Sequence, residues 1–272
     1  MPNNFSVYIH FPFCAKKCAY CNFYSLDNNL ELVSDWTEAL INEIELYSEL
    51  FEEHGIKTIY IGGGSPNLLA KNHFEKIIAA LKKYVNSDQL DEFTVEINPS
   101  NVEEDLIKSL KSSGVDRISI GCQSFDQEDL SILGRLHTPE EFYQTLALIK
   151  KIDFPKISLD FIFGIPRQDI AAWSSTLEKA VKTGTQHLSL YNLTYEPETT
   201  LTSMVNSGKY KKLDEKLEWK MYEYAHNYLL KRGFEHYEIS NWATPGNKSI
   251  HNQIYWNGKN YIGLGPAAHS YY

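Results

Sequence analysis

Three of the four cysteines, Cys14, Cys18 and Cys21, lie within one eight-residue stretch. Three thiolates on one loop can bind three irons of a [4Fe–4S] cube, which leaves the fourth iron open to an exchangeable small molecule. The alternative is a zinc ion, which normally has four closed ligands and would here have to recruit His10 or His54. The spacing therefore predicts an iron–sulfur cluster with an open coordination position.

Other residues suited to binding follow the carboxyl ends of predicted strands or helices. The segment GGGSP at 62–66 follows a strand, and its glycines would let the backbone approach a ligand closely, although a tight turn explains them equally well. Glu96, Gln123, Arg135 and Asp160 stand at or just beyond the ends of other elements. A single Arg or Asp at such a place usually belongs to a surface ion pair of little energetic weight.

Strand-like and helix-like segments alternate regularly up to residue 193. β-branched runs predict strands at 6–11, 57–64, 92–98, 116–123, 156–164 and 187–193. Helical periodicity predicts helices at 30–53, 68–85, 102–112 and 169–183, and a broken helical region at 126–150. Six β–α steps predict an α/β fold with a parallel sheet wrapped by helices, in which sites form at the carboxyl ends of the strands. After residue 193 the pattern changes to a long helix over 214–232 and a Tyr/Trp-rich stretch.

The composition excludes several functional classes. With 26 basic and 35 acidic residues the net charge is −9, which argues against nucleic-acid binding and offers no polybasic route to an anionic membrane. The chain has no run of 18 apolar residues and no signal-peptide pattern at its start. These features predict a cytoplasmic protein, and clustered thiols in a reducing compartment favour a metal centre over disulfides.

The segment YIHFPFCAKKCAYCNFYS resembles the cluster loop of radical S-adenosylmethionine (SAM) proteins, specifically the oxygen-independent coproporphyrinogen III oxidase-like family. The resemblance implies a partial (β/α)6 barrel over residues 1–195 and a C-terminal α+β extension over 196–272, without the further helical domain usual in the family. It also implies that SAM chelates the open iron of the cluster. In the family, one electron from the cluster cleaves SAM to a 5′-deoxyadenosyl radical.

The resemblance also implies roles for individual residues of this chain. Tyr8 and Glu96 match residues that contact the cluster-bound SAM, and Gly63, Gly64 and Ser65 match the segment that contacts its methionine part. A second SAM pocket of the oxidases is matched by Tyr20, Gly64, Ser65, Gln123, Arg135 and Asp160.

Two features resemble the HemW-type haem chaperones within this family more than the oxidases. The oxidases carry a fourth cysteine two residues after the third, where this chain reads Asn22-Phe23. The motif HNQIYW at 251–256 places His251 near two aromatic residues, as an axial ligand and planar contacts for haem would require. The alternative is a histidine packed in an aromatic hairpin.

This second resemblance implies haem or porphyrin as a ligand, a haem-accepting respiratory protein as a partner, and a homodimer. Contact with the inner face of the membrane would be peripheral at most. The rival functions are radical decarboxylation of coproporphyrinogen III and radical SAM chemistry on another substrate, because barrel loops change function easily.

Overall fold

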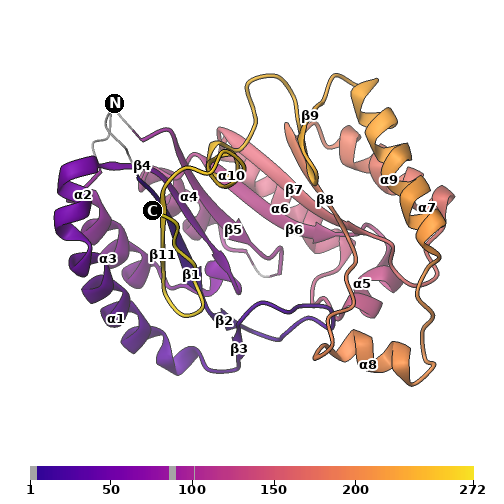
Figure 1. Ribbon diagram of the computed structural model, residues 1–272, viewed down its shortest axis with the longest axis horizontal. Helices are drawn as coiled ribbons and strands as arrows, with labels where there is room; N and C mark the ends of the chain where they lie inside the picture. Colours follow the sequence, from indigo (N-terminus) through magenta and orange to yellow (C-terminus); the bar gives the residue numbers. More distant parts are fainter. Residues whose placement is uncertain (1–4, 86–89, 101) are drawn as a thin grey trace.

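A computed structural model describes residues 5–85, 90–100 and 102–272 (Figure 1). Its main feature is a sheet in the order β11-β1-β4-β5-β6-β7-β8-β10-β9. Every neighbouring pair from β11 to β8 is parallel, whereas β10 pairs antiparallel with both β8 and β9. The strands are β11 (Tyr261–Leu264), β1 (Phe5–Phe11), β4 (Ile56–Gly63), β5 (Glu92–Ile97), β6 (Arg117–Gln123), β7 (Lys156–Phe163), β8 (His187–Asn192), β10 (Asn241–Ala243) and β9 (Glu235–Glu238).

The six predicted strands are confirmed as β1 and β4 to β8, which follow one another across the sheet in sequence order. A separate pair, β2 (Phe13–Cys14) and β3 (Leu26–Asp27), flanks the cysteine loop. The C-terminal part of the chain contributes strands to both edges of the main sheet, because β11 lies beside β1 and β10 lies beside β8. The α/β class with a predominantly parallel sheet is therefore confirmed.

The helices are α1 (Val33–Leu46), α2 (Ser48–His54), α3 (Lys71–Lys82), α4 (Glu104–Ser112), α5 (Gln127–Leu133), α6 (Pro139–Lys151), α7 (Ile170–Lys182), α8 (Thr200–Asn206), α9 (Glu215–Leu230) and α10 (Ile250–Trp256). Most of them cover the outer side of the curved sheet, whereas α10 packs against β4 at one end of it (Figure 1). The single helix predicted over 30–53 is divided at Tyr47 into α1 and α2. No described helix is long and apolar enough to cross a membrane.

The predicted break in the region 126–150 is confirmed, and its cause is local. Gly134 ends α5 in the left-handed conformation, with φ of 70°. Thr138 then starts α6 with a capping box to Glu141, and Pro139 occupies the first turn, where it costs no hydrogen bond. This short connection fixes Arg135 between two helices.

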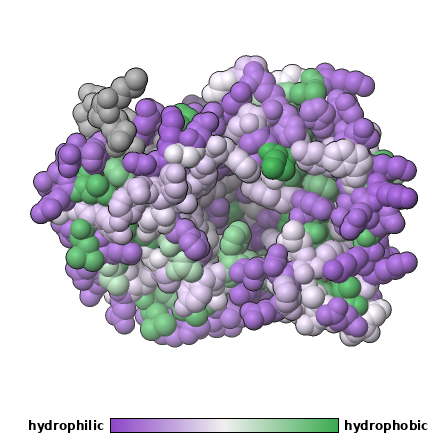
Figure 2. Space-filling model, in the orientation of Figure 1, coloured by the Kyte–Doolittle hydropathy of each residue, from purple (hydrophilic) through white to green (hydrophobic). Residues whose placement is uncertain are grey.

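Alternate residues of the strands face the helices and the inside of the sheet, as the two-residue period of a strand requires. In β1 the residues Val7, Ile9 and Phe11 are buried in the main hydrophobic core. The intervening positions are polar: the Thr58 hydroxyl donates to Ser6 at 2.8 Å across the β1–β4 pair. The inner face of the sheet is thus largely polar. The face of the molecule seen in Figure 2 is hollowed near its middle.

Candidate functional site

A cavity of about 550 Å³ lies between the cysteine loop and the carboxyl ends of the parallel strands. Eleven of the thirteen residues singled out in the sequence line it: Cys14, Cys18, Tyr20, Cys21, Gly63, Gly64, Ser65, Glu96, Gln123, Arg135 and Asp160. Residues far apart in the chain meet here because parallel strands bring their carboxyl ends to one edge of the sheet.

The cysteine loop is fixed to the barrel through Ala19. Its N–H donates to the Leu133 carbonyl at 2.9 Å, and its carbonyl accepts from the Leu201 N–H at 2.8 Å. The loop passes so close to Gly134 that a Cβ there would lie 2.9 Å from the Ala19 nitrogen. Gly134 therefore serves both the end of α5 and the close approach of the loop.

The cysteine thiols are partly buried and lie near the Arg135 guanidinium. Burial raises the pKa of Cys14 and of Cys21 above the ordinary value for a thiol. Arg135 opposes this for Cys14, and its Nη1 lies 3.5 Å from the Cys18 Sγ. Thiolate is the form that binds metal, so a guanidinium at this place favours a thiolate-bound cluster.

The donor set fits a cluster better than a single ion. No group of three or more His, Cys, Asp or Glu in the described residues is arranged around one metal ion. A [4Fe–4S] cube needs a wider arrangement, because each cysteine binds a different iron. The zinc alternative gains no support, since His10 Nε2 already donates to the Tyr24 carbonyl at 2.8 Å.

The glycine segment makes room for other parts of the site. A Cβ on Gly62 would lie 2.8 Å from the Glu96 carboxyl carbon, and one on Gly63 would lie 2.6 Å from the His10 ring. A Cβ on Gly64 would meet the Phe13 carbonyl oxygen at 2.4 Å. These glycines therefore let the end of β4 approach the Glu96 side chain, the His10 ring and the start of the cysteine loop at very short range.

Two half-buried carboxyl groups line the cavity. Burial raises the pKa of Glu96 to about 7, although the Tyr60 hydroxyl, which donates to its Oε1 at 2.7 Å, acts in the opposite direction. Burial also raises the pKa of Asp160 to about 6, against hydrogen bonds from Ser189 and Ser119 and the charge of Arg135. Both groups are thus poised to change charge near neutral pH, and a cationic ligand would favour their ionised forms.

Three polar atoms of the cavity residues are buried without a hydrogen-bond partner in the described residues, Ser25 Oγ, Gln123 Oε1 and Arg135 Nε. Gln123 also has a positive φ of 65° and sits at an irregularity in the β6–β7 pairing. Buried polar groups are nearly always paired in folded proteins, and strained backbone gathers at functional sites. An acceptor and a donor are therefore available to a bound polar molecule.

Several cavity residues were missed in the sequence. They include Asn22, Asn98, Tyr191, Asn192, Thr194 and Glu196. Tyr191 and Asn192 end β8, so the rule that singled out the other strand ends could have found them. Thr194 and Glu196 follow β8 without any motif, and nothing in the sequence marks them.

Tyr8 and His251 do not line this cavity. The Tyr8 hydroxyl lies 3.0 Å from His10 Nδ1 on the inner side of the sheet. Because His10 Nε2 donates to a carbonyl, its Nδ1 accepts, and Tyr8 is the donor. His251 lies on α10, at the end of the barrel opposite the cysteine loop (Figure 1).

The HNQIYW segment forms the helix α10, and the hairpin considered as an alternative is wrong. His251 is 1% exposed, with its Nδ1 2.8 Å from the Thr58 hydroxyl and its Nε2 2.8 Å from the Tyr255 hydroxyl. By contrast, Tyr255 and Trp256 are 38% and 59% exposed. The helix therefore presents aromatic surface outside and anchors it with a buried histidine.

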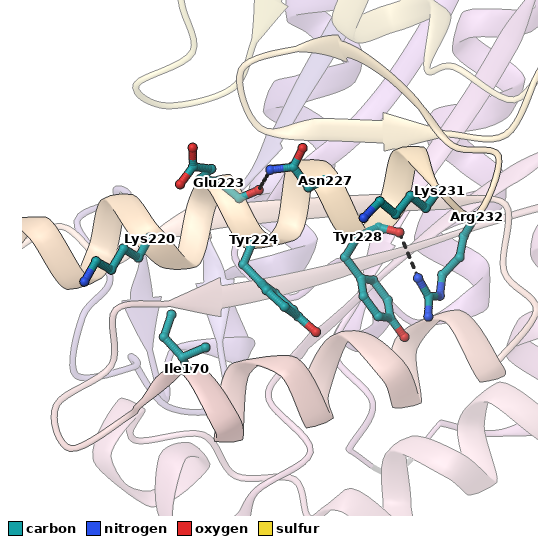
Figure 3. A pocket seen from close by; sticks show the side chains of 8 residues that line it. All are labelled: Ile170, Lys220, Glu223, Tyr224, Asn227, Tyr228, Lys231 and Arg232. Carbon is teal, nitrogen blue, oxygen red and sulfur yellow. Dashed lines mark hydrogen bonds between the residues drawn. The ribbon is translucent and has the colours of Figure 1, made fainter.

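Another hollow, of about 590 Å³, lies between α7 and α9 (Figure 3). Tyr224 and Tyr228 point from α9 toward α7, and the Arg232 guanidinium lies 3.4 Å from the centre of the Tyr228 ring. These side chains are engaged with one another, and none of the residues singled out in the sequence lies there. The cavity at the cysteine loop is the one that concentrates reactive groups.

Comparisons with known proteins agree with this geometry. A model of the radical SAM superfamily matches residues 8–180. The heme chaperone HemW of Lactococcus lactis is 36% identical over 98% of this chain and 69% of its own length, and HemW of Escherichia coli is 35% identical over 97% and 69%. The mitochondrial radical S-adenosyl methionine domain-containing protein 1 of Danio rerio is 36% identical over 97% of this chain and 60% of its own length.

Among solved structures, coproporphyrinogen III oxidase (HemN) from Escherichia coli superposes with a TM-score of 0.84, covering 98% of this chain and 64% of that one. At 22% identity this likeness shows the fold. Membership of the superfamily implies a [4Fe–4S] cluster and SAM as cofactors. The chain belongs to the radical SAM superfamily and, within it, to the HemW family.

Proposed function

We propose that this chain is a haem chaperone, which binds haem and passes it to an acceptor protein. The cluster and SAM would serve to organise the structure of the protein. The observation that carries the haem part is the exposed aromatic surface of α10, the helix formed by HNQIYW. The haem chaperone name of relatives at 33–36% identity supports the same assignment.

Cys14, Cys18 and Cys21 would hold the cluster, which supplies an open iron and a one-electron donor to bound SAM. The chain's own residues shape the rest of the cavity. Glu96 and Asp160 would accept hydrogen bonds from a cationic ligand, and Gln123 and Arg135 offer an unpaired acceptor and donor. Gly63, Gly64 and Ser65 would border the methionine part, and Tyr20 the rest of the cavity.

Tyr8 contributes from below the cavity. Its hydroxyl donates to His10, whose ring packs against Gly63. We therefore assign Tyr8 to the support of the SAM-binding segment through His10. Tyr8 and His10 would thus control the position of the end of β4 at Gly63, without a direct contact in the cavity.

Haem would bind at α10, where the exposed faces of Tyr255 and Trp256 suit a planar porphyrin. The Tyr261 ring packs nearly perpendicular to that of Tyr255, with centroids 4.7 Å apart, and so supports it. His251 holds the Tyr255 hydroxyl from inside, so direct bonding of His251 to haem iron requires release of that hydrogen bond. His251 thus contributes to haem binding either as the ligand or as the support of Tyr255.

Haem titration of the reconstituted protein, followed in the Soret region, tests these roles. His251→Ala and Trp256→Ala should each weaken haem binding, and Tyr255→Phe separates the two roles of His251. If His251 is the ligand, Tyr255→Phe keeps the wild-type Soret spectrum, because the freed Nε2 still reaches the iron. If all three variants keep wild-type haem affinity, haem binding at α10 is refuted.

An anaerobic assay distinguishes the chaperone from the oxidase. Reconstituted protein with a spectroscopically verified cluster is incubated with dithionite, SAM and coproporphyrinogen III, and the products are analysed by mass spectrometry. We expect no protoporphyrinogen, because the oxidases' Cys-x-Cys is replaced by Cys21-Asn22-Phe23. Catalytic formation of protoporphyrinogen would overturn the proposal.

The acceptor is proposed to be a haem-requiring respiratory protein, reached in the cytoplasm or at the inner face of the membrane by peripheral contact. The acidic balance of the chain suits contact through that partner better than contact with anionic lipid. A homodimer is part of the same proposal. Sedimentation of the reconstituted protein with and without haem would test it.

A further inference from the structure

Two histidines outside both proposed sites face each other across α9 and β9. His226 lies on α9 and His236 on β9, and their Nδ1 atoms are 2.9 Å apart. Both side chains are half-buried. In the described residues β9 is the edge strand of the sheet and pairs only with β10. The histidine pair therefore connects the outermost strand to the helix that covers it.

The surroundings of His236 fix which of its nitrogens carries the proton. Its Nε2 lies 3.2 Å from the Ile239 carbonyl oxygen, which can only accept a hydrogen bond. The proton is consequently on Nε2, and Nδ1 presents a lone pair to His226. An imidazole that donates its other N–H to a backbone carbonyl is the usual arrangement of a histidine that binds a metal.

Packing holds the His236 ring in this orientation. The ring stacks on Trp242 with centroids 4.1 Å apart and planes 7° from parallel, and Trp242 is fully buried. Tyr222 closes another side, with its hydroxyl donating to the same Ile239 carbonyl at 3.0 Å. The lone pair of His236 is thus preorganised, which lowers the ordering cost of binding.

The separation of the two Nδ1 atoms favours particular ions. Metal–imidazole bonds are about 2.0–2.1 Å long, so two nitrogens 2.9 Å apart subtend about 90° at an ion between them, once the rings, whose centroids are 5.0 Å apart, turn their lone pairs from each other toward the ion. Neighbouring positions of a square-planar or tetragonal ion make that angle, as Ni²⁺ and Cu²⁺ prefer. A tetrahedral Zn²⁺ would need the nitrogens to move apart to about 3.3 Å.

We propose that His226 and His236 form a binding site for a divalent ion of tetragonal preference, Ni²⁺ or Cu²⁺, through their Nδ1 atoms. Without metal, the Nδ1–H group of His226 donates a hydrogen bond to the Nδ1 atom of His236. On binding, that proton leaves Nδ1 and the ring is protonated at Nε2 through solvent, so two metal–nitrogen bonds form without net proton release. Water completes the coordination, since no described third His, Cys, Asp or Glu joins the pair.

Bound metal would cross-link β9 to α9. An ion that binds only the folded chain stabilises it by mass action, and the gain here falls on the edge of the sheet. The site is independent of the haem role proposed for α10. Failure of either proposal leaves the other standing.

Nickel titration of tag-free, cluster-reconstituted protein by calorimetry under anaerobic conditions tests the proposal. Ni²⁺ is the probe because Cu²⁺ would oxidise thiolates. We expect one Ni²⁺ per chain, and loss of that binding in His226→Gln and in His236→Gln. His54→Gln, which changes a histidine at the end of α2, is the matched control and should bind as the wild type does.

Nickel X-ray absorption should show two imidazole ligands in the wild type and one at most in the variants. Should His236→Gln fail to fold, His226→Gln alone decides, because its side chain lies on the partly exposed face of α9. Absence of nickel binding by the wild type would overturn the proposal. Equal binding by the wild type and His226→Gln would overturn it too.

Discussion

Replacement of Arg117 by Leu should loosen the end of the barrel that carries α10. Arg117 and Glu92 form an ion pair at 3.0 Å whose side chains are 2% and 0% exposed. Arg117 also donates to the Asn247 and Lys248 carbonyls just before α10. Removal of one partner from a buried pair costs about 3–5 kcal/mol, because the other charge stays buried without compensation.

The loss of stability expected for Arg117→Leu lies near the lower end of this range. Glu92 keeps other donors in the variant, the Ser249 hydroxyl at 2.8 Å and the backbone N–H groups of Ile250 and His251 at 3.0 and 3.2 Å. These groups form the first turn of α10, where a carboxylate is favoured by the helix dipole. We therefore expect a loss of about 3 kcal/mol in the free energy of unfolding.

Urea unfolding followed by tryptophan fluorescence measures this loss. If the free energy of unfolding falls by about 3 kcal/mol per M of urea, the urea concentration at the midpoint of unfolding should fall by about 1 M. The matched control is Arg167→Leu, which breaks an ion pair with Glu128 whose side chains are 67% and 60% exposed. An exposed pair contributes about 0–1 kcal/mol, so the control midpoint should barely move. Equal midpoints for the two variants would refute the reasoning.

Acid provides a second check on the same pair. Burial works to raise the pKa of Glu92, but Arg117 and the α10 donors overcome it, and the pKa lies below its ordinary value. A carboxylate of lowered pKa stabilises the fold above the unfolded-state value of about 4.3, and this contribution is lost as the pH falls. The difference in the free energy of unfolding between wild type and Arg117→Leu should therefore become smaller below about pH 4.

Four further predictions concern the cavity. Loss of any one cluster cysteine should remove the iron and the cluster absorbance, whereas Cys122→Ala, a buried core change, should keep both. The three cluster variants are Cys14→Ala, Cys18→Ala and Cys21→Ala. Gly64→Ala should reduce iron retention and SAM binding, because its Cβ would meet the Phe13 carbonyl at 2.4 Å; wild-type iron content would contradict this. Burial raises the pKa of Glu96 from 4.5 to about 7, so the fold loses stability as the pH rises through that interval. The loss in the free energy of unfolding between pH 4 and pH 8 should amount to about 3 kcal/mol for this group, and urea unfolding of Glu96→Gln at the two pH values should show that it is gone. Tyr60→Phe removes a hydrogen bond that lowers this pKa, so the pH midpoint of SAM binding should move upward, and an unchanged midpoint would show that Glu96 does not titrate with SAM.

Much of the cavity could be predicted because it follows from a topological rule. Once six parallel strands are recognised, residues at their carboxyl ends must meet, and Glu96, Gln123 and Asp160 do line the cavity together. The division of one predicted helix at Tyr47 could not be anticipated, because apolar residues occur on both sides of it, Ile44 before and Leu50 and Phe51 after. Periodicity reports the buried face of a helix and not its continuity.

The position of His251 could not be read from the motif. Sequence shows a histidine near two aromatic residues, but only the fold shows that it points inward to Thr58 while Trp256 stays outside. Burial of this kind depends on contacts between residues nearly two hundred positions apart. The histidine pair of α9 and β9 could not be predicted either, because His226 and His236 lie ten positions apart on two different elements.

The two ends of the barrel are connected by one strand. Glu92 and Glu96 both face inward from β5, because four residues are two full periods of a strand, and they lie about 13 Å apart along it. Glu92 holds the start of α10, and Glu96 lines the cavity at the other end. Tyr60 spans the interval: its hydroxyl donates to Glu96, and its ring lies 5.1 Å from that of His251. A ligand that changes the charge of Glu96 therefore acts on Tyr60, a side chain packed directly against α10, where haem is proposed to bind; under that proposal SAM would influence haem binding without being cleaved.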